Sequence, residues 1–229
     1  MTVIDAGAVG EYRIAPSILS ADFGNLGHDV AVIDAETDWL HVDVMDGHFV
    51  PNVTLGPPVV ASLRRYSSRF FDCHLMMSEP GRYLEAFARA GANGCTVHVE
   101  IGGTAQLIDD AHALGLRVGL AANPDTPFHA VAPFLGDIDL LLLMTVFPGF
   151  GGQSFMGDVM EKVEEARREV DRNVLALDIE VDGGIDVTTA PIAVRAGANV
   201  LVAGSAIFAR ADPLAAAAAL RSAAFGAAS

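Results

Sequence analysis

The sequence is poor in cysteine and in basic residues, and each shortage excludes a class of protein. The 229 residues contain two cysteines, Cys73 and Cys95. These are too few for a disulfide framework and predict a reducing, cytoplasmic environment. Lysine and arginine together number 14 against 29 aspartates and glutamates, which gives a net charge of −15. A chain this acidic, without a basic stripe, is not expected to bind nucleic acid.

Long hydrophobic runs are also missing. The longest apolar stretch, 140–147, is far too short to span a bilayer, so no membrane association is expected. The first ten residues include Asp5 and lack a long apolar segment, which is not the pattern of a signal peptide. Apolar residues as a whole are plentiful at 52% of the chain, enough to bury the core of one domain.

Short runs of β-branched and apolar residues alternate with amphipathic stretches along the whole chain. The runs predict strands over 13–19, 39–45, 70–75, 94–99, 116–121, 140–146, 178–182 and 199–203. The amphipathic stretches predict helices near 24–35, 57–65, 80–90, 104–114, 128–134, 156–170, 187–196 and 213–224. This alternation predicts an α/β protein, a single-domain (β/α)₈ TIM barrel over 1–229. A doubly wound open sheet is the alternative, but no Gly-x-Gly-x-x-Gly follows the first strand.

Three of the predicted strands carry acids and imidazoles on one face, because alternate residues of a strand point the same way. The three faces hold His41, Asp43 and Met45; Asp72, His74 and Met76; and Asp178, Glu180 and Asp182. An unpaired buried carboxylate is very costly, so the polar faces must meet a compensating group. Each of these side chains alone could be a hydrogen-bonded core residue or a cap. Together, two histidines and two carboxylates from three strands favour a bound metal.

Glycine-bearing turns follow the last three predicted strands. They are the segment 148–153, the pair Gly183-Gly184 and the pair Gly204-Ser205. Glycine lets the backbone approach a ligand closely and offers N–H groups to phosphate oxygens. Barrels commonly bind phosphate with the loops after strands seven and eight. Any βα turn can need glycine, but three such turns in succession favour a phosphate ligand, and the segment 149–152 suits a flap over substrate.

Six segments of the chain resemble the ribulose-phosphate 3-epimerase family. They are APSILSAD at 15–22, HVDVMDGHFVPN at 41–52, DCHLM at 72–76, MTV at 144–146 with PGFGGQ at 148–153, EVDGGI at 180–185, and GSAIF at 204–208. The segments run in order over most of the chain, and the second is long and specific. The resemblance implies a (β/α)₈ barrel of the ribulose-phosphate binding type, with residues 1–12 as an N-terminal extension.

The resemblance also implies a function, that of an isomerase of the pentose phosphate pathway. Such an enzyme is a metal-dependent 3-epimerase that interconverts D-ribulose 5-phosphate and D-xylulose 5-phosphate. One divalent ion per subunit (zinc, iron, cobalt or manganese) would be held by His41, Asp43, His74 and Asp182. Asp43 and Asp182 would also be the catalytic acid–base pair, acting through a metal-bound cis-enediolate. A homo-oligomer is expected.

The family pattern further assigns contacts with the sugar phosphate. These would come from Ser17, His74, Gly149, Phe150, Gly151, Gly152, Asp182, Gly183, Gly184, Gly204 and Ser205. Met45, Met76 and Met144 match the methionines that pack against the planar intermediate. The chemistry explains the two acids, because a single base would tend to return the proton to the face from which it came. Two carboxylates on opposite faces, one ionised and one protonated, allow inversion.

The sequence leaves two other functions open. Phe147 stands where the family usually has a small polar or acidic residue, so a ketohexose 6-phosphate 3-epimerase, acting on fructose 6-phosphate and allulose 6-phosphate, is one alternative. A non-catalytic sugar-phosphate sensor is the other, although the acids and ligands are all present. A Schiff-base aldolase is not expected, because the single lysine, Lys162, lies within a predicted helix. His98, with Glu100 two residues on, has no assigned role.

Overall fold

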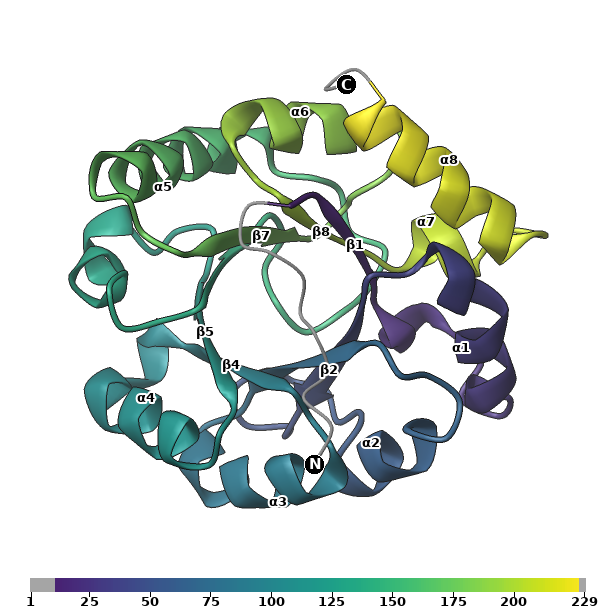
Figure 1. The fold of residues 1–229 in the computed structure, drawn as a ribbon, viewed down its shortest axis with the longest axis horizontal. Coiled ribbons are helices and arrows are strands. Elements are labelled where there is room, and N and C mark those ends of the chain that lie inside the picture. Colours follow the sequence, from purple (N-terminus) through teal and green to yellow (C-terminus); the bar gives the residue numbers. More distant parts are fainter. Residues whose placement is uncertain (1–10, 227–229) are drawn as a thin grey trace.

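The computed structural model describes residues 11–226, in which strands and helices alternate (Figure 1). The strands are β1 (Arg13–Pro16), β2 (Trp39–Met45), β3 (Phe70–Met76), β4 (Gly94–His98), β5 (Arg117–Ala122), β6 (Leu140–Met144), β7 (Asp178–Asp182) and β8 (Val200–Ala203). The α-helices are α1 (Leu26–Ile33), α2 (Pro57–Leu63), α3 (Leu84–Ala90), α4 (Thr104–Ala113), α5 (Met160–Arg172), α6 (Ala190–Ala196), α7 (Ser205–Phe208) and α8 (Pro213–Phe225). Short 3-10 helices are η1 (Ile18–Ser20), η2 (Asp34–Glu36), η3 (Pro80–Arg82), η4 (Val99–Ile101), η5 (Phe128–Ala130), η6 (Ala132–Phe134) and η7 (Gly157–Val159).

The eight strands form one parallel sheet that closes on itself. Their order is β1-β8-β7-β6-β5-β4-β3-β2, and a parallel bridge between Ser17 and His41 joins the two ends. Viewed down the axis, the strands make a ring and the helices surround it (Figure 1). The predicted (β/α)₈ barrel is therefore confirmed, and the open sheet is excluded. All but two residues of the predicted extension over 1–12 lie outside the described residues, so the extension stays a prediction.

The outward face of each strand packs under the helices. In β2 the side chains of Leu40, Val42 and Val44 belong to the main hydrophobic core, which also holds Cys73 and Cys95 as free, buried thiols. This core is built largely from β-branched and leucine side chains, which suit a strand covered on one face by helices. Within residues 11–226 no helix has the length and apolar character needed to cross a bilayer.

At the amino-terminal end of the strands, two arginines neutralise one acid that is buried inside the barrel. Asp178 is fully buried at the start of β7. Its two carboxylate oxygens lie 3.0 Å from Arg13 Nη1 and 3.2 Å from Arg117 Nη2. The guanidinium groups of both arginines also lie over the Trp39 ring, at 5.1 and 5.6 Å. Asp178 thus shares a face with Glu180 and Asp182 but is satisfied as an ion pair at the amino-terminal end, away from the site.

The structure differs from the predicted elements where local chemistry interrupts a pattern. The helix predicted over 128–134 is two 3-10 turns, η5 and η6, because Pro133 has no N–H to donate to a preceding turn. The strand predicted over 13–19 ends at Pro16, because the Ser17 hydroxyl accepts from Leu19 N and caps η1. The pattern at 80–90 divides into η3 and α3. The short helix α7 is not predicted.

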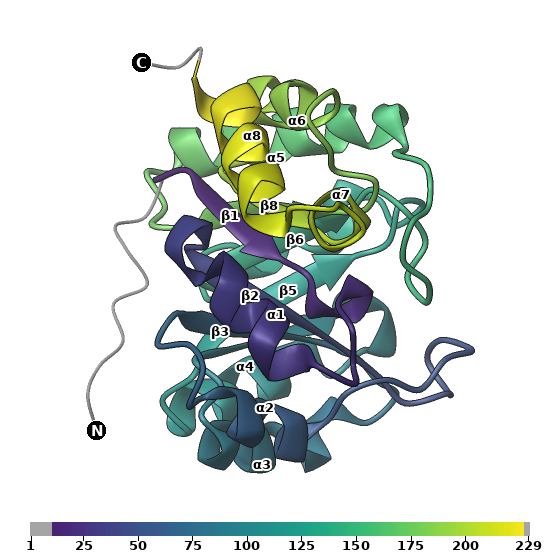
Figure 2. The same cartoon turned by 90° about the vertical axis from the view of Figure 1, so that its right-hand side faces the viewer.

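The loops that follow the strands gather at one end of the barrel. The loops after β2 and β6 extend from the same end in Figure 2, and Asn52 Nδ2 donates to the Gly149 carbonyl across 3.0 Å. The strand ends that carry Asp43, His74 and Asp182 open toward these loops. In barrels of this kind the carboxyl ends of the strands are where function lies.

One close contact inside the barrel predicts a stability change. Gly119 of β5 pairs in register with Thr96 of β4, and a Cβ added at position 119 would overlap the Thr96 side chain. Thr96 Oγ1 in turn donates to Asp72 Oδ1 across 2.9 Å. We expect Gly119→Ala to lower the free energy of unfolding by about 1–3 kcal/mol, as overpacking of a closed interior does. Urea denaturation would measure this loss.

Gly136→Ala is the matched control for that measurement. An added Cβ at Gly136 meets nothing within 4 Å, and its backbone does not adopt a positive φ. Its free energy of unfolding should stay within about 0.5 kcal/mol of the native value. Equal free energies of unfolding for both variants would contradict the prediction. They would show that the Thr96 side chain can move to make room for the added methyl group at little cost.

Candidate active site

Strand register brings the predicted ligands together at the mouth of the barrel. Asp43 of β2 lies opposite His74 of β3, and Asp182 ends β7. Asp43 Oδ1 lies 3.5 Å from both His41 Nε2 and His74 Nδ1. Asp182 Oδ2 lies 3.9 Å from His41 Nε2 and 4.0 Å from His74 Nδ1. The ligand atoms of these four residues all fall within 4.8 Å of one another.

These spacings suit a metal ion. A tetrahedral ion with ligand bonds of about 2.1 Å holds its ligand atoms about 3.4 Å apart. The two histidine–Asp43 separations match that edge, and the two to Asp182 exceed it by about half an ångström. His41 Nε2 and His74 Nδ1 are buried and have no hydrogen-bond partner within residues 11–226. A cation among the four groups would satisfy both nitrogens and both carboxylates, so the residues fit a divalent metal.

His41 is supported from beneath by two further acids. Its Nδ1 lies 2.9 Å from Asp72 Oδ2 and 3.3 Å from Glu180 Oε1, and all three side chains are buried. An N–H on Nδ1 that faces carboxylates leaves the lone pair on Nε2, which faces Asp43 and Asp182. The strand period places Asp72 and Glu180 on the polar faces but assigns them no role. In the structure these two acids lie at ion-pair distance from His41 Nδ1, where their charge favours a hydrogen on that nitrogen.

Burial and neighbouring charge push the pKa values of the two mouth carboxylates apart. Burial raises the pKa of Asp43, but the nearby His41 and His74 imidazoles outweigh it and hold that pKa well below its usual range. Burial, together with the negative charge of Asp43, raises the pKa of Asp182 to about 7. Burial and Asp72 raise the pKa of Glu180 to about 8. Opposite shifts in a pair of acids are typical of acid–base sites.

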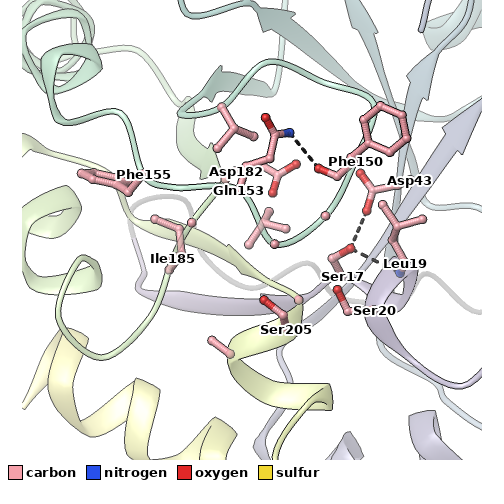
Figure 3. Close-up of a pocket in the computed structure, with 18 of the residues that line it drawn as sticks. Ser17, Leu19, Ser20, Asp43, Phe150, Gln153, Phe155, Asp182, Ile185 and Ser205 are labelled. Atoms are coloured by element: carbon pink, nitrogen blue, oxygen red, sulfur yellow. Dashed lines mark hydrogen bonds between the residues drawn. The ribbon is translucent and has the colours of Figure 1, made fainter. Parts of the chain in front are cut away.

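A cavity of about 360 Å³ opens above Asp43 and Asp182. Figure 3 shows both side chains among the residues that line it. Asp43 and Asp182 line it, as do the three methionines predicted to pack on the intermediate, Met45, Met76 and Met144. The Ser17 hydroxyl, also on its wall, donates to Asp43 Oδ2 across 2.5 Å. The imidazoles of His41 and His74 lie below the floor, fully buried, and do not line the cavity. The site therefore has acids and sulfurs facing the cavity and imidazoles behind them.

The glycine turns form the opposite wall of this cavity. Gly183, Gly184, Gly204 and Ser205 all line it. Gly184 has a φ of +65° and lies so close to Phe155 that an added Cβ would come within 2.5 Å of the Phe155 amide nitrogen. Within residues 11–226 the amides of Gly184 and Ser205 donate no hydrogen bond. Free amides on a glycine wall suit an anionic group such as a phosphate.

The segment 147–155 covers the cavity as a folded loop. Gln153 Nε2 donates to the carbonyls of Phe147 and Phe150, across 2.7 and 2.8 Å, and so closes the loop on itself. Gly149, Phe150, Gly151 and Gly152, which are predicted to contact the sugar phosphate, line the cavity. Phe147 does not line the cavity, and its side chain is 48% exposed. The departure from the family pattern at Phe147 therefore lies outside the space where a substrate would sit.

Comparison with known proteins identifies the family to which the chain belongs. The family model described as the ribulose-phosphate 3 epimerase family matches residues 13–208. The chain belongs to this family. A cytoplasmic isoform of ribulose-phosphate 3-epimerase from Oryza sativa subsp. japonica is 45% identical over 195 residues, covering 82% of this chain and 84% of the relative. The ribulose-phosphate 3-epimerase of Rhodobacter capsulatus is 48% identical over 187 residues, with 80% of each chain covered.

Solved structures support the fold alone. 3-Hexulose-6-phosphate synthase from Salmonella typhimurium superposes with a TM-score of 0.70 at 18% identity, covering 93% of this chain and 99% of that one. Orotidine 5'-phosphate decarboxylase from Pyrococcus horikoshii superposes with a TM-score of 0.67 at 15% identity, covering 92% and 98%. The resemblance to the epimerase family is thus confirmed, and so is the prediction of an isomerase, because the matched relatives are named epimerases.

Sequence reasoning misses several residues that line the cavity of this family member. They include Leu19, Ser20, Gln153, Phe155, Ile185 and Arg210. Four of them lie inside the segments that resemble the family, so those segments carry more of the site than the residues singled out. Arg210 follows the last segment by two positions, and it is the only lysine or arginine on the described cavity wall. Lys162 instead donates to the Asn123 and Pro124 carbonyls.

Proposed function

We propose that the chain is a 3-epimerase that interconverts D-ribulose 5-phosphate and D-xylulose 5-phosphate. The observation that carries this is the pair Asp43 and Asp182 on the floor of a cavity whose far wall is made of glycine turns. In the metal-free site the pKa of Asp43 lies below its usual range and that of Asp182 is raised to about 7, so the two acids differ in their tendency to hold a proton. A proton acceptor and a proton donor that reach opposite faces of one carbon are what its inversion requires.

In this mechanism Asp43 removes the proton from C3 of the ketose, and the electron pair of that C–H bond moves toward the C2 carbonyl. Asp182 then delivers its proton to the opposite face of C3, which inverts the configuration. The reverse reaction exchanges the two roles. Ser17 orients Asp43 by donating to Oδ2. Met45, Met76 and Met144 present sulfur and methyl groups to the planar intermediate and exclude water without adding hydrogen-bond partners.

A divalent metal is part of the proposal, with His41, Asp43, His74 and Asp182 as the residues that would hold it. Such an ion supplies electrostatic stabilisation, worth several kcal/mol, to the negative charge that develops on the substrate oxygens. Two imidazoles and two carboxylates suit zinc, iron, cobalt or manganese. We further propose a cytoplasmic homo-oligomer. Two free, buried thiols support the cytoplasm, and one relative is named a cytoplasmic isoform.

At the other end of the substrate, Gly183, Gly184, Gly204 and Ser205 would receive the phosphate with their amides, as predicted. The loop 149–152 would close over the sugar between them and the acids. Phe147 supplied the main reason to consider a ketohexose 6-phosphate, and its side chain lies outside the cavity lining. The pentose phosphate is therefore the substrate that the site supports best. The hexose epimerase and the sugar-phosphate sensor become outcomes of the experiment.

Proton NMR in D₂O distinguishes these functions. Purified, metal-loaded protein is incubated with ribulose 5-phosphate and, separately, with fructose 6-phosphate. We expect deuterium to enter C3 of the pentose as xylulose 5-phosphate appears, with kcat/KM at least tenfold above that for the hexose. Faster conversion of the hexose would retain the mechanism and replace the substrate. Binding of either sugar phosphate without exchange would identify a sensor and contradict the proposal.

A further inference from the structure

Two further side chains, His98 and Glu100, extend a hydrogen-bonded series from His74 toward the surface. His74 Nε2 lies 2.8 Å from His98 Nε2, and His98 Nδ1 lies 3.0 Å from Glu100 Oε2. Both imidazoles are fully buried, with ring centroids 5.0 Å apart. The Phe49 ring packs on His98 at 4.6 Å and closes it off. His98 is outside the four-residue cluster and does not line the cavity, so it touches neither ligand atoms nor substrate space.

The far end of this series is anchored by a carboxylate. Glu100 Oε1 accepts from the Asn123 amide across 2.7 Å and from Thr126 Oγ1 across 2.5 Å. Burial raises the pKa of Glu100, but the hydrogen bonds from His98, Asn123 and Thr126 outweigh it and lower that pKa to about 2. An ionised carboxylate only accepts hydrogen bonds. Its second oxygen, Oε2, therefore requires a hydrogen on His98 Nδ1.

A hydrogen on His98 Nδ1 determines which of the other ring nitrogens of His98 and His74 carry hydrogens. Only one hydrogen fits between the two Nε2 atoms, which lie 2.8 Å apart, and a His98 ring with its hydrogen on Nδ1 presents the lone pair of Nε2 to His74. The lone pair accepts a hydrogen from His74 Nε2, so the second nitrogen of His74 carries the lone pair. This second nitrogen is Nδ1, which lies 3.5 Å from Asp43 Oδ1 and faces the cluster. The opposite arrangement would place a hydrogen where a ligand lone pair is needed.

We propose that His98 and Glu100 are positioning residues, which fix His74 in the Nε2–H tautomer and so raise the affinity of the cluster for a divalent metal. This inference rests on the proposed function, because it needs the cluster to be a metal site. It assigns a role to two side chains that touch neither metal nor substrate. His41 Nδ1 lies at ion-pair distance from Asp72 and Glu180, whereas the contact described for His74 Nε2 within residues 11–226 is with His98.

The first test is the affinity for Zn²⁺ alone, measured on metal-free protein by competition with a chromophoric chelator. His98→Phe retains an aromatic ring beside Phe49 but removes both nitrogens, and we expect it to bind Zn²⁺ about 10–100-fold more weakly. His98→Gln, whose amide oxygen can accept from His74 Nε2–H, should recover part of that loss. Glu100→Ala should bind more weakly than the native protein, since His98 is then no longer held in one tautomer.

His112→Phe is the matched control. His112 on α4 also faces an acid, with Nε2 3.4 Å from Asp139 Oδ2, but this pair lies at the surface and outside the cavity lining. Its Zn²⁺ affinity should stay within twofold of the native value. If His98→Phe also stays within twofold, the proposed role is wrong. Thermal denaturation of each metal-free variant shows whether a loss of affinity comes from a loss of fold.

A second measurement needs no variant. Two-bond ¹H–¹⁵N spectra of the histidines in metal-free native protein report which ring nitrogen carries the hydrogen. We expect the Nε2–H form of His74 and the Nδ1–H form of His98. A hydrogen on His74 Nδ1 would overturn the inference even if the metal affinities agree with it. Native protein that binds no Zn²⁺ would instead contradict the metal part of the proposed function, while the spectra still decide the tautomer.

Discussion

Asp43→Asn and Asp182→Asn should each lower kcat for epimerisation by at least about 10³-fold, because each variant loses one of two proton-transfer groups. Asparagine preserves shape and an oxygen ligand but cannot take or give the C3 proton. Both acids line the cavity, and their pKa values are shifted in opposite directions. Turnover of ribulose 5-phosphate followed in a coupled assay measures the loss, and circular dichroism checks that the barrel is intact.

Asp212→Asn is the matched control for the two acid variants. Asp212 accepts from the Ala215 amide at the N-terminus of α8, and asparagine caps a helix about as well. Its turnover should remain within twofold of native. The same chemical change is thus made at a position that lies outside the cavity lining. If either mouth acid tolerates the change with turnover within tenfold of native, the two-carboxylate assignment is wrong.

The two acids differ in what surrounds them rather than in kind. Asp43 lies between two imidazoles and accepts from Ser17, so its ionised form is stabilised. Asp182 contacts the same imidazoles at longer distances and feels the negative charge of Asp43. A shared site that can hold one proton between two carboxylates titrates as a pair. This asymmetry is established by the barrel before any substrate enters.

Strand periodicity in the sequence predicted the faces but not the depth along the barrel. Asp178, Glu180 and Asp182 share one face of β7, as predicted, yet they meet three different environments. Asp178 pairs with Arg13, 165 positions away, at the bottom of the barrel. Glu180 lies beside His41 in the middle, and Asp182 reaches the mouth. Only the pairing of distant strands decides which partner each acid receives, and no local pattern contains that information.

The sequence motifs identified the residues that line the cavity better than the residues that contact them from behind, such as His98 and Glu100. Segments that resemble the family included the acids, the methionines and the glycine turns, and the structure brings these residues together around one cavity. His98 had no assigned role from sequence, since a histidine at the end of a strand is equally well explained by core packing. Glu100, the partner of His98, lies two positions further along the sequence. The contact between His98 and His74 follows instead from the register of β3 and β4, in which His74 lies opposite Thr96. The helix predicted over 128–134 was wrong because a single proline outweighs an amphipathic pattern.

Removal of metal is expected to abolish epimerisation and to leave the barrel folded. The buried nitrogens His41 Nε2 and His74 Nδ1 have no partner within residues 11–226. Electrostatic stabilisation of a developing oxyanion by a cation is worth several kcal/mol, and a loss of about 4 kcal/mol lowers a rate by about 10³-fold. The four residues that would hold the ion lie on β2, β3 and β7, whose outward faces pack in the main core, so the strands do not need the ion to form.

Dialysis against a chelator, with elemental analysis of the product, gives the metal-free protein for this measurement. Its turnover of ribulose 5-phosphate should fall by at least about 10³-fold. One equivalent of Zn²⁺, Mn²⁺, Co²⁺ or Fe²⁺ should restore it, and the ion that restores most identifies the preferred metal. His74→Ala should show the same low rate with or without added ion, because the cluster then lacks one of its two imidazoles. A protein shown to be metal-free that retains its native rate would contradict the metal part of the proposed function, because Asp43 and Asp182 by themselves offer no positive charge to the developing oxyanion.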